Sequence, residues 1–462
     1  MTLSRRLARQ VRAIGAAAIP ADVRACGRLH LLDAIGVALA AAATGVGRPY
    51  LDAAVILGGA GPANILGSGL TRDAATAALL NGGLMHGLEY DDTHTASIVH
   101  GSAVLAPAAL AVAQEAEASG EDLLRAYILG WEVLVRMGLA APGAFQARGF
   151  QVTSVGGTLV AALEAAEILK LDENRTVAAL GIALSQASGV FEFLSNGASV
   201  KSMHPGWAAH AGLLAARLAA AGLDGPESAL EGRMGLFQQF AVDGERAVDG
   251  FAAQLASLGR HWHLREAAYK FLPCCHYLHP YVEALDQLGS VDPARIRAVT
   301  CLVAPGAAQI ICEPWARKQA PASGHEVRWS LPIVVAARLI DGSIGHATFA
   351  HPPTAAVRDL AARVTWSPLA SSQFPQRFEA EMTVMFGDGG EQRCRIDDVF
   401  GGANRPASAN QVKAKFRANA ALALEDAAVA GLEDAVEALA HDGLARLGMQ
   451  LSSPRINAGS AA

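Results

Sequence analysis

Lysine, cysteine and aromatic residues are scarce in this chain of 462 residues, and charged residues make up only 17% of it. Apolar residues account for 52%, which excludes a disordered, solvated chain. Aromatic residues account for 6%, so alanine, leucine and valine must fill the core, and this favours close packing of helices. At this length we expect two domains.

The sequence also lacks the features of nucleic-acid-binding, secreted and membrane proteins. The formal net charge is -6, so no general basic field would attract nucleic acid or an anionic membrane. Six cysteines are too few for a disulfide scaffold of this size. Glycines and a proline interrupt the long apolar stretch without charge at residues 53–71, which argues against a transmembrane helix there. We therefore expect a cytoplasmic protein without nucleic-acid or membrane partners.

Two patterns of hydrophobic residues divide the chain. Up to about residue 265, alanine- and leucine-rich segments with helical spacing predict long helices, over residues 22–43, 103–118, 121–139, 157–169 and 206–221. From residue 295, β-branched or alternating segments predict strands, over residues 296–303, 361–366, 379–386 and 392–396. A hairpin turn is expected at residues 386–390 and one helix at residues 329–339.

Helical patterning returns over residues 410–447, so the β-rich part interrupts a helical one. We predict a mainly α protein with an α+β part. Its large all-helical domain is discontinuous and comprises residues 1–265 and 408–462. The smaller α/β domain comprises residues 266–407.

Only six lysines occur in the chain, so each position that retains one is informative. Lys201 and Lys270 lie in short polar segments with histidine nearby, where a compact ammonium group can bind an anion. Lys170 ends a helix, and Lys413 and Lys415 lie on a polar helical face, so we expect these three to be solvated. A surface position is also the alternative for Lys201 and Lys270.

Residues 88–102 combine acidic, histidine and hydroxyl side chains before a predicted helix. We expect Ser102 to cap this helix and His100 to lie beside its exposed N–H groups, a position that favours a bound anion. Capping aspartates and a loop histidine are the structural alternative. A metal site is a further alternative, although the spacing of the possible ligands matches no closed set: Asp91, Asp92, His94 and His100.

Polar residues precede two other predicted helices. Pro205 fits the first position of one helix, which puts His204 near its N-cap and Lys201 just before it. Lysine and histidine at the positive end of a helix favour a carboxylate or phosphate. Gln151 lies in a similar segment, before the paired glycines Gly156 and Gly157, which also suit tight helix packing.

The segment from Tyr269 to Pro280 lies at the predicted domain boundary. His279 precedes a proline and can begin a helix. Zinc is an alternative here, but the adjacent cysteines lack the spacing of structural zinc sites; the possible ligands are Cys274, Cys275, His276 and His279. Because no phosphate-binding glycine motif is present, these segments favour a polycarboxylate over a nucleotide.

These segments resemble the MmgE/PrpD family, which includes 2-methylcitrate dehydratase, cis-aconitate decarboxylase and iminodisuccinate epimerase. The resemblance covers nearly the whole chain and rests on residues 81–93, 100–102, 269–275, 330–332 and 339–342. It implies a large helical domain with a smaller α/β domain, a homodimer, and an active site between the domains. It also implies chemistry that needs no metal, iron–sulfur cluster or nucleotide.

The resemblance assigns roles to individual residues of this chain. It implies catalytic roles for four residues, His100, Lys201, Lys270 and Asp92. Substrate-binding roles are expected for six others, Glu89, Asp91, Thr93, Gln151, His204 and His279. The chain departs from the family in three places: Gln151 replaces a histidine, Glu89 replaces the usual aspartate, and residues 303–314 contain no tyrosine. Because glutamine cannot exchange protons at neutral pH, the first departure argues against cis-aconitate decarboxylation.

The residues and the resemblance together predict a cofactor-independent lyase of the 2-methylcitrate dehydratase type, acting on a small di- or tricarboxylic acid. His100 would move the proton α to a carboxylate, with Asp92 orienting it or binding substrate. Lys201 and Lys270 would stabilise the charge that develops. The alternatives are an epimerase of the iminodisuccinate type and a non-catalytic carboxylate-binding relative, which Gln151 suggests.

Overall fold

The computed structural model describes residues 1–289, 291–441 and 443–452, and the chain divides into two units. Unit 1 comprises Met1–Phe193, Ala198–Ala267 and Ser408–Ala462. Unit 2 comprises Leu194–Gly197 and Ala268–Ala407. The predicted fold class, a large helical part with a smaller α/β part, is confirmed.

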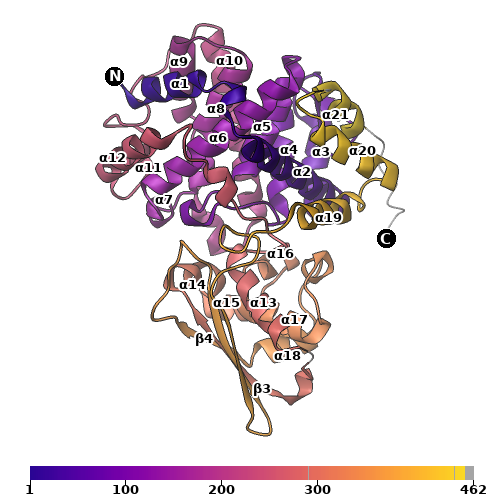
Figure 1. The fold of residues 1–462 in the computed structure, drawn as a ribbon. Helices are drawn as coiled ribbons and strands as arrows, with labels where there is room; N and C mark the ends of the chain where they lie inside the picture. The colour runs from indigo at the N-terminus through magenta and orange to yellow at the C-terminus, as the bar shows by residue number, and fades with distance from the viewer. Residues whose placement is uncertain (290, 442, 453–462) are drawn as a thin grey trace. The chain divides into compact units, whose positions relative to one another are not determined.

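Unit 1 is built from helices and one small sheet of β1 (Ala63–Asn64) and β2 (Thr71–Arg72). Its first helices are α1 (Leu3–Ala13), α2 (Ala21–Ala43), α3 (Arg48–Ile56), α4 (Ala74–Gly87), α5 (Gly101–Glu115), α6 (Gly120–Ala140) and α7 (Ala144–Ala147). The next are α8 (Val152–Ile168), α9 (Glu173–Leu184), α10 (Met203–Ala220), α11 (Leu236–Phe240) and α12 (Gly244–Gln254). The chain returns to this unit with α19 (Ala409–Ala420), α20 (Asp426–Glu437) and α21 (Gly443–Leu451). Figure 1 shows α19 beside α2, against which it packs.

Small residues let the central helices approach closely. A Cβ atom at Gly82 of α4 would lie 2.4 Å from the Cα atom of Gly206 in α10, so only glycine fits this crossing. The crossing brings the end of α4 near the start of α10, where Lys201 and His204 lie. Close packing of alanine-rich helices therefore positions the candidate site.

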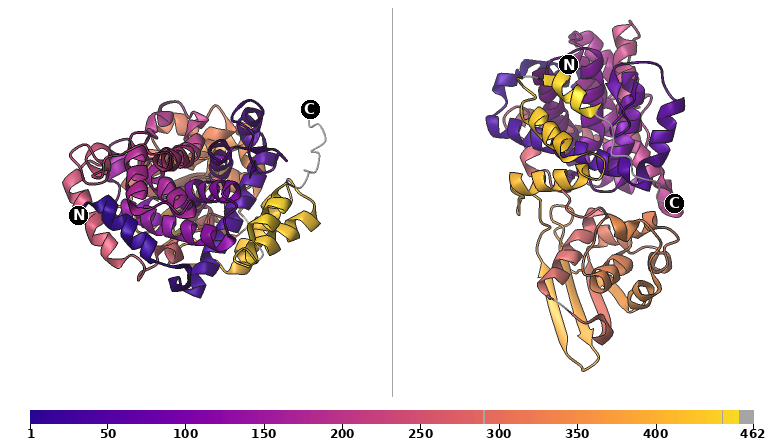
Figure 2. Two further views of the ribbon diagram at one scale, coloured as in Figure 1. Left: turned by 90° about the horizontal axis from the view of Figure 1, so that it is seen from above. Right: turned by 90° about the vertical axis from the view of Figure 1, so that its right-hand side faces the viewer.

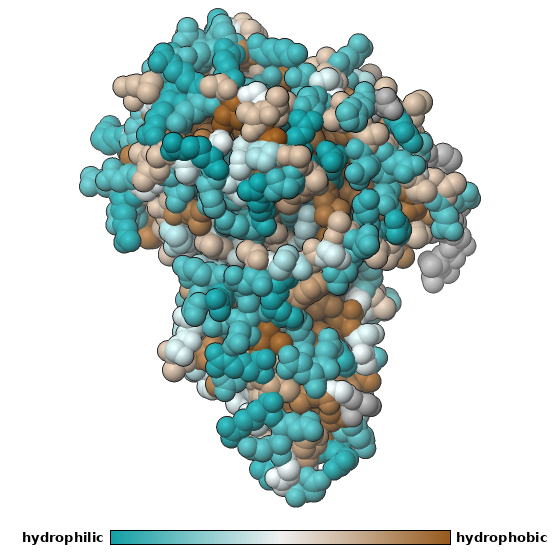
Figure 3. Space-filling view, in the orientation of Figure 1, coloured by the Kyte–Doolittle hydropathy of each residue, from teal (hydrophilic) through white to brown (hydrophobic). Residues whose placement is uncertain are grey.

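The longest helix of unit 1 is α2, with 23 residues. By length and composition alone, α2 could cross a membrane, but 78% of its most apolar window is buried inside the structure. Such burial is typical of a core helix. On the face drawn in Figure 3, hydrophilic side chains predominate, with smaller apolar patches between them.

Three helices begin earlier than their apolar pattern predicts. Helix α5 begins at Gly101 and α8 at Val152, so His100 and Gln151 are the N-cap residues. Helix α10 begins at Met203, which makes Pro205 its third residue rather than its first. The first turns of α5 and α8 consist largely of small or hydroxyl residues that are buried, and a pattern of apolar residues alone does not register them.

Unit 2 contains a four-stranded sheet in the order β4-β3-β5-β6. Its strands are β3 (Ile296–Val303), β4 (Val364–Pro368), β5 (Ala380–Phe386) and β6 (Glu391–Ile396). The β3–β4 pair is parallel, and the β3–β5 and β5–β6 pairs are antiparallel. The hairpin turn is where the sequence predicts it, with Gly389 at φ 88°, a value that favours glycine.

The helices of unit 2 gather on one face of this sheet (Figure 2). They are α13 (His279–Gln287), α14 (Pro305–Ile311), α15 (Trp315–Gln319), α16 (Gly324–Val327), α17 (Leu331–Asp341) and α18 (Ala355–Ala361). Helix α17 ends at Gly342 in the left-handed conformation, as its sequence predicts.

Candidate active site

Most of the predicted site residues lie at or beside the ends of four helices in unit 1. Residues 88–100 connect α4 to α5, and Glu89 in this connection has a positive φ of 53°. Such a conformation is unfavourable for a residue with a side chain and is held only where the surroundings fix it. The buried ion pair of the Glu89 carboxylate with Lys201, described next, provides such surroundings.

Lys201 is buried and forms an ion pair with Glu89. Its Nζ atom contacts Oε1 of Glu89, which is only 3% exposed. The same Glu89 oxygen lies 3.8 Å from Nε2 of His86, near the end of α4. The alternative of a surface lysine at position 201 is therefore wrong, because Lys201 is buried and paired with the buried Glu89 carboxylate.

Asp91 extends these polar contacts to His100. Its Oδ2 atom lies 2.8 Å from Nδ1 of His86 and 3.3 Å from Nδ1 of His100. The two imidazole rings meet edge to face, with centroids 5.0 Å apart. A continuous polar series thus runs from Lys201 through Glu89, His86 and Asp91 to His100.

The contacts of His100 define its tautomer. Its Nδ1 atom faces two acceptors, Oδ2 of Asp91 and the backbone oxygen of Asp92 at 3.2 Å. The hydroxyl of Thr93 also lies 3.2 Å from Nδ1. Nδ1 therefore carries the proton in the neutral ring, and Nε2 carries the lone pair that can accept a proton.

The carboxylate of Asp92 has different partners. Oδ2 lies 2.8 Å from Nδ1 of His30 in α2, and Oδ1 accepts a hydrogen bond of 3.1 Å from the backbone N–H of Ser102. The Ser102 hydroxyl also donates to Asp92 and lies 2.6 Å from the hydroxyl of Tyr127. Asp91, rather than Asp92, therefore contacts His100 through its carboxylate, whereas we predicted that Asp92 would either orient His100 or bind substrate.

His30 and Asp92 form a buried charged pair beneath the loop. Burial opposes the charged form of His30, but Cys26 and the Asp92 carboxylate raise its pKa to about 10. Both side chains are almost fully buried. The pair therefore attaches the connection between α4 and α5 to helix α2.

Gln151 is buried and contacts His204. Its Oε1 atom lies 2.9 Å from Nδ1 of His204, and Gln151 is only 4% exposed. Gln151 therefore does not turn to solvent. Burial, with the nearby charges of His86 and Lys201, lowers the pKa of His204 to about 4. His204 is therefore neutral at pH 7, with its Nδ1–H donating to the glutamine and its lone pair on Nε2.

Lys270 and His279 belong to unit 2. Lys270 is fully buried, and His279 begins α13 with Nε2 3.3 Å from the backbone oxygen of Cys274. The prediction that His279 begins a helix is confirmed. Their catalytic and substrate-binding roles stay predictions.

The metal ligands suggested by the sequence do not form one group. Asp91 and His100 lie with His86, Asp92 lies with His30, and His94 lies with a different cluster. In the described part of the chain, two groups place three or more possible ligand atoms within 4.8 Å of one another. Neither includes the cysteines or histidines of residues 274–279. One group is His86, Asp91 and His100, and the other is His94, His263 and Glu266.

The structure adds three residues that we did not predict from the sequence to contact the loop of the site: His86, His30 and Lys415. Lys415 was expected in solvent, but its Nζ atom lies 2.8 Å from Asp33 Oδ1 and 2.9 Å from the backbone oxygen of Tyr90. It also lies 4.1 Å from the centre of the Tyr90 ring. This buried contact ties α19 to the loop that carries the site.

Comparison with known proteins identifies the relatives of this chain. Residues 5–248 match the MmgE/PrpD N-terminal domain, and residues 272–441 match the MmgE/PrpD C-terminal domain. The chain belongs to the MmgE/PrpD family. The resemblance seen in the sequence is thereby confirmed.

Relatives within the MmgE/PrpD family cover most of the chain. A cis-aconitate decarboxylase of Aspergillus terreus (strain NIH 2624 / FGSC A1156) is 27% identical over 445 residues, which span 91% of this chain and 90% of the relative. The cis-aconitate decarboxylase of Mus musculus is 30% identical over 380 residues, 79% of this chain and 75% of the relative. That of Homo sapiens is 29% identical over 354 residues, 74% of this chain and 72% of the relative. These relatives confirm the prediction that this protein is an enzyme.

Proposed function

We propose that the protein is a lyase that removes the proton α to a carboxylate of a small di- or tricarboxylic acid. The observation that carries this proposal is the fixed tautomer of His100, whose Nδ1 faces the Asp91 carboxylate. A neutral imidazole in this state presents Nε2 as a base near neutral pH. The family and its decarboxylase relatives support the lyase class.

Lys201 would stabilise the negative charge that forms on the substrate. When the α proton leaves, electrons shift onto the carboxylate oxygens, and a nearby ammonium group favours this state. Glu89 holds the ammonium of Lys201 in place. Because an ammonium group has three N–H donors, Lys201 can donate to a substrate carboxylate while it remains bound to Glu89.

For a hydroxy acid, the proposed reaction is dehydration. His100 takes the α proton, the bond between the β carbon and its hydroxyl breaks, and a carbon–carbon double bond forms. The hydroxyl leaves as water with the proton that His100 received, which returns the imidazole to its neutral state. Side chains supply each of these steps, so we propose a reaction that uses no cofactor.

Decarboxylation is the second candidate, because the reported relatives are named cis-aconitate decarboxylases. Gln151 argues against it, since an amide now occupies the place of a family histidine and cannot exchange protons. The buried hydrogen bond to His204 shows that Gln151 is part of the polar interior. Simple return of the proton to the substrate would give an epimerase instead.

A product analysis separates these reactions. The full chain would be incubated with citrate, 2-methylcitrate, cis-aconitate and iminodisuccinate, and the products followed by proton NMR. Loss of water from a hydroxy acid supports dehydration, and release of CO₂ supports decarboxylation. If none of these acids reacts but some raise the melting temperature, the chain is a carboxylate-binding protein and the lyase proposal fails.

A further inference from the structure

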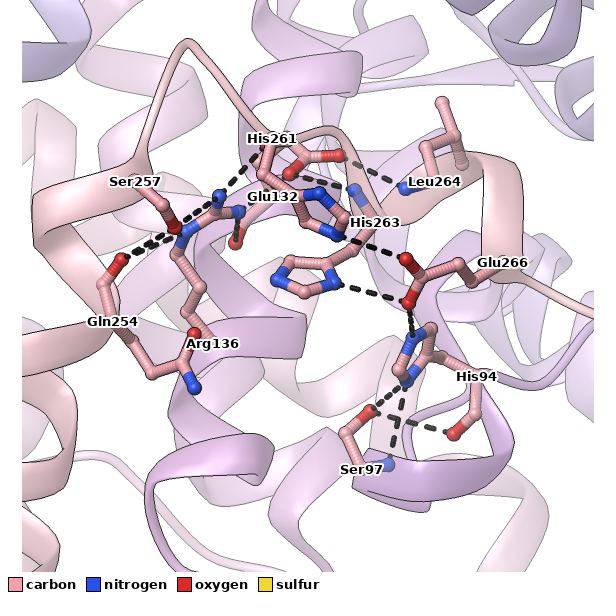
Figure 4. A network of polar contacts seen from close by, with 10 residues as sticks. All are labelled: His94, Ser97, Glu132, Arg136, Gln254, Ser257, His261, His263, Leu264 and Glu266. Atoms are coloured by element: carbon pink, nitrogen blue, oxygen red, sulfur yellow. Dashed lines mark hydrogen bonds and ion pairs between the residues drawn. The ribbon is translucent and has the colours of Figure 1, made fainter. Parts of the chain in front are cut away.

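A second polar cluster in unit 1 lies around Glu266, outside the series that ends at His100. Glu266 belongs to the 3₁₀ helix η7 (His263–Glu266), and Figure 4 shows its carboxylate between three imidazole rings. Its Oε2 atom lies 3.3 Å from Nε2 of His94 and 3.1 Å from Nδ1 of His263. Its Oε1 atom lies 2.8 Å from Nε2 of His261.

We propose that His94, His263 and Glu266 form a binding site for a divalent transition metal, with Zn²⁺ as its preferred ion. Two imidazole nitrogens and one carboxylate oxygen are a ligand set that zinc accepts, with water in the fourth position. In a tetrahedral site with ligand distances of about 2.0–2.1 Å, neighbouring ligand atoms are roughly 3.3 Å apart. The distances of 3.3 Å and 3.1 Å from Glu266 to the two histidines match this spacing.

The burial of the three ligands suits a site that opens to solvent on one side. The side chains of His94 and His263 are 2% and 10% exposed, whereas that of Glu266 is 37% exposed. An ion can therefore enter beside Glu266 and bind two nitrogens that bulk water does not surround. His261 contacts the other oxygen of Glu266 and would orient the carboxylate, as outer partners of metal ligands do.

Hydrogen bonds hold the ligands in place. Nδ1 of His94 lies 2.8 Å from the hydroxyl of Ser97. The backbone N–H of Ser97 also donates to Nδ1, over 3.3 Å, while the ring proton is on Nε2. When Nε2 binds a metal, the ring proton moves to Nδ1, this backbone hydrogen bond is lost, and the Ser97 hydroxyl can accept the proton instead. Both carboxylate oxygens of the fully buried Glu132 accept backbone hydrogen bonds, of 3.1 Å from His263 and 2.9 Å from Leu264 (Figure 4).

The lack of one hydrogen bond at His263 limits the affinity of the site for Zn²⁺. Among the described residues, none hydrogen-bonds to the buried Nε2 atom of His263. Binding a metal through Nδ1 puts a proton on Nε2 without an acceptor, which lowers affinity on the order of tenfold to a hundredfold. We therefore expect tighter binding than at a surface histidine but weaker binding than at a closed structural zinc site.

Titration of the full chain with Zn²⁺ tests this site. After removal of metal with a chelator, isothermal titration calorimetry should show one equivalent bound. At a hundredfold excess over the dissociation constant, Zn²⁺ should raise the melting temperature on the order of 5 °C. Co²⁺ in its place should give the visible absorption of a low-coordinate site. Absence of saturable binding overturns the proposal.

Variants locate the ion. Glu266→Gln keeps the shape of the side chain but removes its charge, and it should weaken Zn²⁺ binding at least tenfold. His94→Gln provides a second test if the first variant fails to fold, as judged by circular dichroism. Glu245→Gln, at an exposed acid of α12, should bind like the parent chain. Unchanged affinity in Glu266→Gln overturns the proposal, as does loss of binding in His100→Asn, which would place the ion at the other group.

Discussion

The Oδ2 atom of Asp91 lies 3.3 Å from the Nδ1 atom of His100. This contact places the proton of the neutral His100 ring on Nδ1, and through His86 it connects His100 to the ion pair of Glu89 and Lys201. The predicted site residues Lys201, Glu89, Asp91 and His100 therefore belong to one series of polar contacts.

Asp91→Asn should lower kcat by about 10²–10⁴-fold, because an amide no longer holds the His100 proton on Nδ1. Steady-state kinetics of the purified variant would measure the loss. Asp52→Asn removes an exposed acid that pairs with Arg48 on the surface and should leave kcat unchanged. Equal activity of Asp91→Asn and the parent chain would show that Asp91 does not support the base.

Lys201→Met should reduce both activity and stability. Removing one partner of a buried ion pair takes the ammonium group away from the buried Glu89 carboxylate, at a cost of about 3–5 kcal/mol in the free energy of unfolding. The double variant Lys201→Met with Glu89→Gln should recover much of this stability in urea unfolding and remain inactive. Recovery of activity together with stability would show that Lys201 is only structural.

The neutral His204 makes stability depend on pH. Its pKa of about 4 lies below the unfolded value of 6.5, so the unfolded chain binds more protons between these values. Its contribution of about 3 kcal/mol is complete above pH 6.5 and is lost as the pH falls through 4. His204→Asn should therefore flatten the decline of melting temperature between pH 6.5 and 4. An equally steep decline in both proteins would mean that other groups cause it.

Lys415 and Lys413 form a matched pair of variants on α19. Lys415→Met leaves Asp33 buried without its cation and should destabilise the chain by about 3–5 kcal/mol. Lys413 contacts Glu433 and Glu437 at the surface, so Lys413→Met should cost less than about 1 kcal/mol. Chemical denaturation would measure both. Similar effects of the two substitutions would contradict the buried position of Lys415.

Gln151→His should place a second titratable group against His204. Because Gln151 is buried and bonded to His204, we expect a changed pH–rate profile or new activity toward citrate-like acids. The measurement is kcat/KM as a function of pH for the variant and the parent chain. An identical profile and substrate range would show that position 151 lies outside the site.

Much of the fold follows from the sequence. The strand at residues 296–303 and the turn at residues 386–390 lie where alternation and glycines predict them. The starts of α5, α8 and α10 do not, because their first turns contain small, polar or proline residues that apolar spacing does not register.

The sequence indicated which types of residue form the site, but not which side chains contact one another. Glu89, Asp91 and His100 are close in sequence, but a short loop can turn each side chain in several directions. His30 and Asp33 are the polar residues of the otherwise apolar part of α2, residues 29–43, and such buried groups require partners. That signal could have indicated His30 and a partner for Asp33, although Asp92 and Lys415 lie far away in the sequence.

The most direct test of the proposed base measures exchange of the α proton with solvent. The parent chain and His100→Asn would be incubated in deuterated water with an acid on which the parent chain acts, and deuterium at the α carbon followed by NMR. We expect incorporation with the parent chain and a rate reduced by about 10²–10⁴-fold with His100→Asn. Incorporation at the parent rate in a folded His100→Asn variant would contradict the assignment of His100 as the base.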